Sequence, residues 1–119
     1  MYKTNKGFEY EKIAQRYLSA NGYRILAVNF FCRFGEIDII AKKNEYLIFI
    51  EVKGRKNISA GYPREYVTKS KVKKLLLTVK YYMMVNNYAD MNCRFDVLEV
   101  IYDAKKINHI KNAIEMEGF

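Results

Sequence analysis

The sequence predicts a single α/β domain in which a mixed β-sheet is flanked by helices. Two stretches with helical spacing of apolar residues alternate with stretches rich in β-branched and bulky residues, in the order helix, three strands, helix, strand. The chain has 119 residues, half of them hydrophobic, which suits one packed domain over residues 1–119. The longest apolar run, Tyr46–Ile50, is far shorter than the roughly 18 residues of a membrane span, so we expect no membrane partner.

Two segments are predicted to be helical. The first, over about 7–20, places Leu18 on an apolar stripe and ends at Gly22, a residue that commonly follows a helix. The second runs from Thr68, whose side chain can cap a helix, to about Asn87. Its apolar positions follow helical spacing with lysines on the flanks, which indicates one face on the core and one in solvent.

The remaining regular segments are predicted to be strands. Residues 23–32, 36–41, 46–53 and 93–102 are rich in bulky and β-branched side chains, and a short polar turn joins the second to the third. The third is apolar on both faces through Ile50, which indicates a central strand. The tail is compatible with either a short strand or a helical turn.

Acidic residues stand where apolar side chains belong. Glu11 lies two helical turns before Leu18, on the stripe of the first helix that faces the core. In the third strand, the period of two places Glu51 and Lys53 on the same face as Phe49, at the end of a row otherwise suited to the core. This placement favours a role for these charges in catalysis or ligand binding over a role in solubility.

Asp38 is predicted to lie opposite Glu51 across a hairpin. A turn centred on residues 44–45 sets these two residues against each other, whereas a slip of one residue would put them on opposite faces. Opposed carboxylates repel, and burying them costs several kcal/mol per ion. A divalent cation compensates directly, because Mg²⁺ is held by one or two carboxylates together with water and phosphate oxygens.

A simpler interpretation is that these charges are solvated at strand ends, or that Asp38 pairs with a lysine. For any one residue that is the commoner case, since most charged residues are exposed. The combination of Asp38, Glu51 and Lys53 on one hairpin, beside a misplaced Glu11, favours a cation-holding site.

The net charge of +8 fits either solubility alone or a polyanionic partner. Candidate phosphate contacts follow the third strand and begin the second helix, with a solvated helix face as the alternative: Arg55, Lys56, Arg64, Lys69, Lys71, Lys73 and Lys74. Tyr62 and Tyr66 are candidates for base stacking or for core packing.

Cysteine usage and the N-terminus favour a cytoplasmic protein. Cys32 and Cys93 lie far apart with no short spacing that would suit zinc, so two buried, reduced thiols are expected. The N-terminal residues are polar and contain no signal-peptide core. His109 has no partner at useful spacing and is expected to be structural.

Residues 35–41 (GEIDIIA) followed by 49–55 (FIEVKGR) resemble the signature of the YraN family of small bacterial predicted endonucleases. That family is similar to archaeal Holliday-junction resolvases and belongs to the restriction-endonuclease-like, PD-(D/E)xK superfamily. The resemblance covers nearly the whole chain and extends to Gly7 and Glu11, Gly61 and Pro63, Arg94-Phe95-Asp96-Val97, His109 and Asn112-Ala113. One departure is Tyr10, where the family usually has glycine.

The resemblance implies a restriction-endonuclease-like fold and a Mg²⁺- or Mn²⁺-dependent endonuclease that cuts DNA, including branched or structured DNA. Asp38 and Glu51 would be metal ligands, Lys53 the catalytic lysine, and Glu11 a helix-borne acid that completes the site. Resolution of a junction would favour a homodimer, because two symmetric strands must be cut. The main alternative is a non-catalytic nucleic-acid-binding module with the same fold, and a protein-interaction adaptor is a third class that the charges do not favour.

Overall fold

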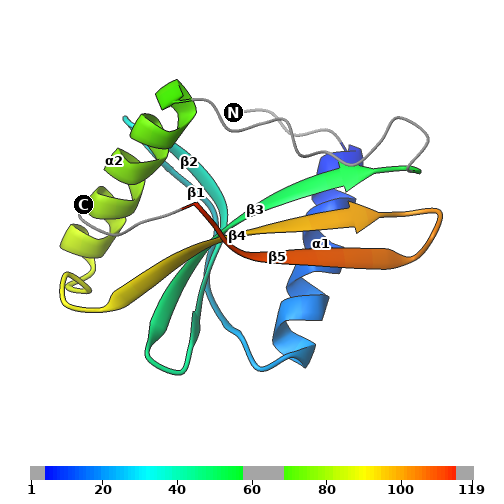
Figure 1. Cartoon of the computed structure of the whole chain (residues 1–119), viewed down its shortest axis with the longest axis horizontal. Coiled ribbons are helices and arrows are strands. Elements are labelled where there is room, and N and C mark those ends of the chain that lie inside the picture. Colours follow the sequence, from blue (N-terminus) through cyan, green and yellow to red (C-terminus); the bar gives the residue numbers. More distant parts are fainter. Residues whose placement is uncertain (1–4, 58–68, 115–119) are drawn as a thin grey trace.

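A computed structural model describes residues 5–57 and 69–114 and shows a five-stranded mixed sheet with a helix on each side (Figure 1). The elements are α1 (Asn5–Ala20), β1 (Arg24–Cys32), β2 (Gly35–Lys43), β3 (Tyr46–Arg55), α2 (Lys69–Val85), β4 (Asn92–Ile101) and β5 (Lys106–Ile114). Strands lie side by side in chain order, with β3 and β4 parallel and all other neighbours antiparallel. The predicted α/β class is confirmed, the architecture is compatible with a restriction-endonuclease-like fold, and the tail is a strand.

The two helices cover opposite faces of the sheet, and β3 lies at its centre. Leu47 and Phe49 are buried in a core cluster with the α2 residues Val79 and Met83. The alternate β3 residues Ile48 and Ile50 belong instead to a cluster that contains Ala14 and Leu18 of α1. Because side chains alternate along a strand, a strand that is buried on both faces must be apolar at nearly every position.

The hairpin between β2 and β3 has the predicted register. Its pairs run from Ile39 opposite Ile50 to Lys43 opposite Tyr46, with Asn44 in the turn at φ 55°. Asparagine tolerates this left-handed conformation better than most residues do. A local turn therefore decides which side chains of β2 and β3 share a face.

Other expectations need correction or lie outside the described residues. Cys32 and Cys93 are free thiols as expected, but each is half-buried rather than fully buried. Thr68, the predicted cap of α2, falls in a segment that the structure does not describe. Of the described helices, neither has the length and apolar character needed to cross a membrane.

Helix α1 packs directly on the β3 backbone through Tyr10. The Tyr10 ring, which is 8% exposed, covers Gly54 so closely that a Cβ added at Gly54 would collide with it. Glycine is needed here because of this close approach. The contact sets the first turns of α1 against the strand that carries Glu51 and Lys53.

Gly54→Ala is therefore expected to lower the free energy of unfolding by about 1–3 kcal/mol, because one extra methyl group overpacks the contact with Tyr10. Urea denaturation of the single variants and of the double variant with Tyr10→Ala measures the coupling. The cost of Gly54→Ala should shrink in the Tyr10→Ala background. An equal cost in both backgrounds would show that the Tyr10 ring is not the obstacle.

Candidate functional site

The central feature of the site is the point where β2 and β3 part. The paired residues of this ladder end at Ile39 and Ile50, and the next amide available on β3, that of Val52, donates a 2.8 Å hydrogen bond to Oδ2 of Asp38. A side-chain carboxylate thus accepts a bond that a strand normally receives from a main-chain carbonyl. This bond holds the Asp38 carboxylate against the β3 backbone.

Glu51 and Lys53 stand on β3 beside this carboxylate. Continuing the hairpin register by one residue sets Asp38 opposite Glu51, a relation that places Cβ atoms about 5 Å apart in a regular antiparallel pair. Lys53 Nζ lies 3.2 Å from Glu51 Oε1, and the two side chains are 29% and 36% exposed. Two carboxylates and an ammonium group therefore meet where solvent and a ligand have access.

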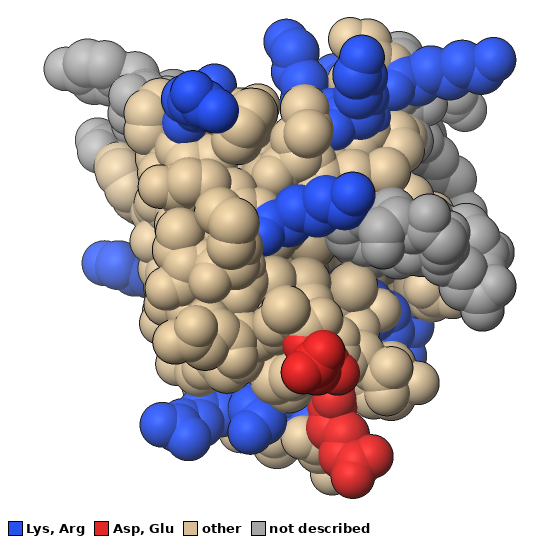
Figure 2. All heavy atoms as spheres, turned by 90° about the vertical axis from the view of Figure 1, so that its left-hand side faces the viewer, with Lys and Arg blue, Asp and Glu red and all other residues tan. Residues whose placement is uncertain are grey.

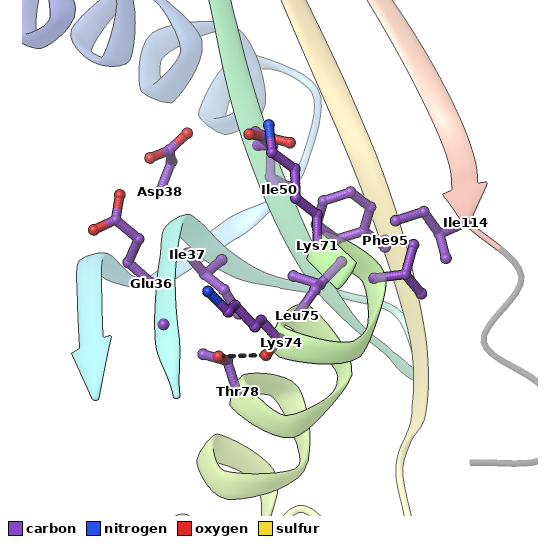
Figure 3. Close-up of a pocket in the computed structure, with 13 residues that line it drawn as sticks. Glu36, Ile37, Asp38, Ile50, Lys71, Lys74, Leu75, Thr78, Phe95 and Ile114 are labelled. Carbon is purple, nitrogen blue, oxygen red and sulfur yellow. Dashed lines mark hydrogen bonds between the residues drawn. The ribbon is translucent and has the colours of Figure 1, made fainter. Parts of the chain in front are cut away.

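A hollow of about 230 Å³ opens beside these carboxylates, between the strands and α2 (Figure 3). We call it the α2 hollow. It is lined by Gly35, Glu36, Ile37, Asp38, Ile50, Glu51, Lys71, Val72, Lys74, Leu75, Thr78, Phe95 and Ile114. Figure 3 shows Glu36 and Asp38 on one side of it and Phe95 and Ile114 on the other.

Lysines dominate the start of α2. Lys69, Lys71, Lys73 and Lys74 are all exposed, and the helix has no acidic residue in its first turn. Figure 2 shows Lys and Arg side chains along the upper part of this face, and again at its lower edge beside the acidic side chains. The positive end of the helix dipole adds to the same sign of charge. An anionic ligand is therefore attracted to the end of α2 that borders the hollow.

The donor set suits Mg²⁺ better than a metal that needs a closed protein cage. Among residues 5–57 and 69–114, no three His, Cys, Asp or Glu side chains are grouped as a metal site. Mg²⁺ is typically held by one or two carboxylates and keeps waters or phosphate oxygens as its other ligands. Asp38 and Glu51 supply the required pair.

Glu11 lies in the other layer of the molecule. Its predicted burial is confirmed, since it is 3% exposed on the α1 stripe, but it does not line the α2 hollow. The reason is the two-sided sheet, in which α1 packs on the face opposite α2. The Tyr10–Gly54 contact brings this turn of α1 to the end of β3. A role for Glu11 in metal binding stays a prediction.

The basic residues that follow Lys53 are held at the end of β3. The carbonyls of Arg55 and Lys56 accept hydrogen bonds of 2.9 and 2.8 Å from the amides of Tyr102 and Asp103. Arg55 is half-buried and Lys56 exposed. The candidates Arg64, Tyr62 and Tyr66 lie outside the described residues.

A buried ionic network, which the sequence reading missed, ties the α1 layer together. Asp96 is 0% exposed and accepts bonds from Arg94 Nε at 2.8 Å, Arg94 Nη2 at 2.9 Å and the Asn112 amide at 2.9 Å. His109 Nε2 lies 2.7 Å from Asp96 Oδ2, the oxygen that also accepts the Arg94 Nη2 bond, and Tyr17 OH lies 3.0 Å from His109 Nδ1. Tyr17 belongs to α1, so this network links that helix to β4 and β5.

The network determines how its members ionise. Burial alone would raise the pKa of Asp96, but hydrogen bonds from His109, Arg94 and the Asn112 amide outweigh it and lower that pKa below 3.8. The bond to Asp96 raises the pKa of Arg94, and burial raises that of Tyr17. Both ring nitrogens of His109 therefore have a hydrogen-bond partner, Asp96 at Nε2 and Tyr17 OH at Nδ1. The partners of His109 are far away in sequence, and its structural role stays a prediction.

Glu99 is a further carboxylate that the sequence reading passed over. It is 0% exposed, Asn108 Nδ2 donates to its Oε1 at 2.6 Å, and its Oε2 has no hydrogen-bond partner among the residues that the structure describes. Glu99 pairs with Lys53 in the parallel β3–β4 register, so the two side chains share the α2 face. The signal was available, because Glu99 continues the row of Phe95 and Val97 just as Glu51 continues a row of apolar residues.

Comparison with known proteins places most of the chain in one family. Residues 10–100 match the model of the uncharacterised protein family UPF0102. A UPF0102 protein of Lachnoclostridium phytofermentans is 44% identical over 119 residues, which cover 99% of both chains. One from Clostridioides difficile is 47% identical, covering 95% of this chain and 99% of its own, and one from Persephonella marina is 38% identical, covering 98% and 99%.

Asp96→Asn is expected to cost about 3 kcal/mol of unfolding free energy at neutral pH, because it leaves the half-buried Arg94 charge without its counter-ion. Since the folded-state pKa of Asp96 is lowered, its ionised form stabilises the fold above pH 3.8, and this contribution is lost as the pH falls through the folded-state value. Urea titrations across this range should show the gap between wild type and variant narrowing at low pH. Asp90→Asn, at an exposed position, is the control. A gap that does not change with pH would contradict this account.

Proposed function

We propose that this chain, which belongs to the uncharacterised protein family UPF0102, is a metal-dependent endonuclease that hydrolyses phosphodiester bonds in DNA. The observation that carries the proposal is the facing pair Asp38 and Glu51 with Lys53 at one end of a hollow that α2 lines with lysines. Two acids followed by a lysine on a β-hairpin agree with the PD-(D/E)xK motif that the sequence resembles.

The carboxylate pair is the group that would hold the cation. Asp38 is fixed against β3 by the bond that its Oδ2 accepts from the Val52 amide. Glu51 binds Lys53 through Oε1, and its side chain is partly exposed. When bound, Mg²⁺ or Mn²⁺ would supply Lewis-acid polarisation of the phosphate and favour deprotonation of a water molecule. The main-chain carbonyl of Val52 and the carboxylate of Glu11 are further candidates for metal ligands.

Lys53 is the group that would respond to charge on the reacting phosphate. Its ammonium lies 3.2 Å from Glu51, so it is held beside the carboxylates rather than extended into solvent. A donor placed in advance at the position where negative charge develops lowers the barrier without reorganisation during the step. Lys53 would also orient the attacking water through an N–H donor.

The lysines of α2 would bind the strand on either side of the cut. Lys71 and Lys74 both line the hollow, and Figure 3 shows both extending from the helix toward the strands. Contacts of this kind fix the position of a phosphate backbone but do not read its sequence. Binding of this type would serve equally a module that does not cut, so cleavage itself is the decisive test.

Asp38→Asn, Glu51→Gln and Lys53→Ala are each expected to lower the rate of DNA cleavage by about 100-fold or more, because each removes a charge that stabilises the transition state. Labelled single-stranded, duplex, flap and four-way-junction DNA with Mg²⁺, Mn²⁺ or EDTA provide the assay. Glu45→Gln is the matched control, since Glu45 is an exposed carboxylate at the far end of the same hairpin.

Calorimetric titration of Mn²⁺ without DNA gives a readout that does not depend on turnover. Asp38→Asn should weaken Mn²⁺ binding while Glu45→Gln leaves it unchanged. Equal cleavage by the wild type and all three site variants would trace the activity to a contaminant and end the enzymatic proposal. DNA binding without cutting on any substrate would leave the non-catalytic module as the function.

Lys71→Ala and Lys74→Ala are each expected to reduce the slope of log K against log salt concentration by about 0.9 on duplex and about 0.7 on single-stranded DNA, the effect of one lost phosphate contact. Fluorescence anisotropy between low and moderate salt measures this slope. Lys12→Ala, at an exposed position on α1, is the control for net charge. A decrease of the same size in all three variants would show that only the overall charge matters.

A further inference from the structure

The α2 hollow has a wall that phosphate binding alone does not require. Besides its acids and lysines it is lined by the apolar residues Ile37, Val72, Leu75, Phe95 and Ile114. A surface that only contacts a phosphate backbone needs charges and hydrogen-bond donors. The apolar lining therefore indicates that a second, apolar part of a ligand enters the same hollow.

The geometry places this apolar wall next to the reacting groups. Val72 and Leu75 are only half-buried, so their side chains lose contact with water when a ligand fills the hollow. Figure 3 shows Leu75 between the two lysines and Phe95, while Asp38 stands across the hollow. A phosphate at Asp38 would thus have its attached nucleoside directed toward the apolar side. The volume of about 230 Å³ has room for one planar ring system.

We infer that the α2 hollow takes one unstacked nucleobase beside the phosphate that is cut, so that the substrate is a strand with an unpaired nucleotide rather than a continuous duplex. This inference rests on the proposed function. Every base has an apolar ring face, so such a site tolerates sequence. Extruding a base from a duplex costs stacking and pairing, and the cost is least where the strand is already unpaired.

The test is a scan of abasic positions along one single-stranded oligonucleotide. Each strand keeps every phosphate and lacks one base, and its binding is measured by anisotropy with Mg²⁺ in a Lys53→Ala background, which prevents turnover. Leu75→Trp fills the hollow, and Val72→Phe narrows it from a neighbouring turn. Leu77→Trp adds the same ring to the same helix at a residue that is 39% exposed and does not line the hollow. Thermal unfolding checks that each variant is folded.

In the Lys53→Ala background and in Leu77→Trp, loss of the base at one position should weaken binding about tenfold, the usual effect of one lost base contact. In a folded hollow variant, Leu75→Trp or Val72→Phe, the same abasic strand should bind as the intact strand does. The inference would be overturned if a missing base weakened binding equally at every position. It would also be overturned if the same single position weakened binding in all variants, the hollow variants included. Failure to bind any strand would overturn it as well.

The experiment separates this inference from the proposed nuclease activity. If loss of the base at one position weakens binding but the protein never cuts DNA, the base site is supported and the nuclease activity is not. If every substrate is cut at an equal rate and no missing base weakens binding more than the others, the nuclease activity is supported and the base site is not.

Discussion

The hydrogen bond from the Val52 amide to the Asp38 carboxylate is the constraint on which the candidate site depends. Two antiparallel strands that part leave amides and carbonyls without ladder partners, and each unpaired buried group costs free energy. Here the carboxylate of β2 satisfies an amide of β3 at the point of parting. That bond fixes Asp38 close to β3, and the hairpin register then sets Glu51 beside it.

The two faces of the sheet differ: the α1 face carries a buried network of hydrogen bonds, and the α2 face is open to a ligand. On its α1 side, Asp96 is fully buried and every oxygen lone pair direction is used by Arg94, His109 or Asn112. Such a network is costly to desolvate, but once complete it fixes the positions of the elements it joins. On the α2 side, the helix begins beside the carboxylates, with lysines and a hollow. A ligand therefore reaches one face while the opposite face holds the strands in place.

Glu99 and Lys53 extend this organisation across β3 and β4. Their parallel pairing sets a buried carboxylate beside the lysine that we assign to catalysis. One Glu99 oxygen is bound by Asn108 of β5, so the row of polar groups crosses three strands on the α2 face. Within the described residues the other Glu99 oxygen has no hydrogen-bond partner, which is rare for a buried carboxylate in natural proteins.

The sequence by itself determined both helices, the first four strands and the register of the site's hairpin, and it left the fifth strand open. Alternation along β3 and a two-residue turn at Asn44 are local properties, so they are sufficient to set Asp38 against Glu51. Only the tertiary structure decided which layer each helix joins, and with it that Glu11 lies away from the α2 hollow. It also brought Tyr17, Asp96 and His109 together, because partners so distant in sequence are joined by packing and leave no pattern of spacing in the chain.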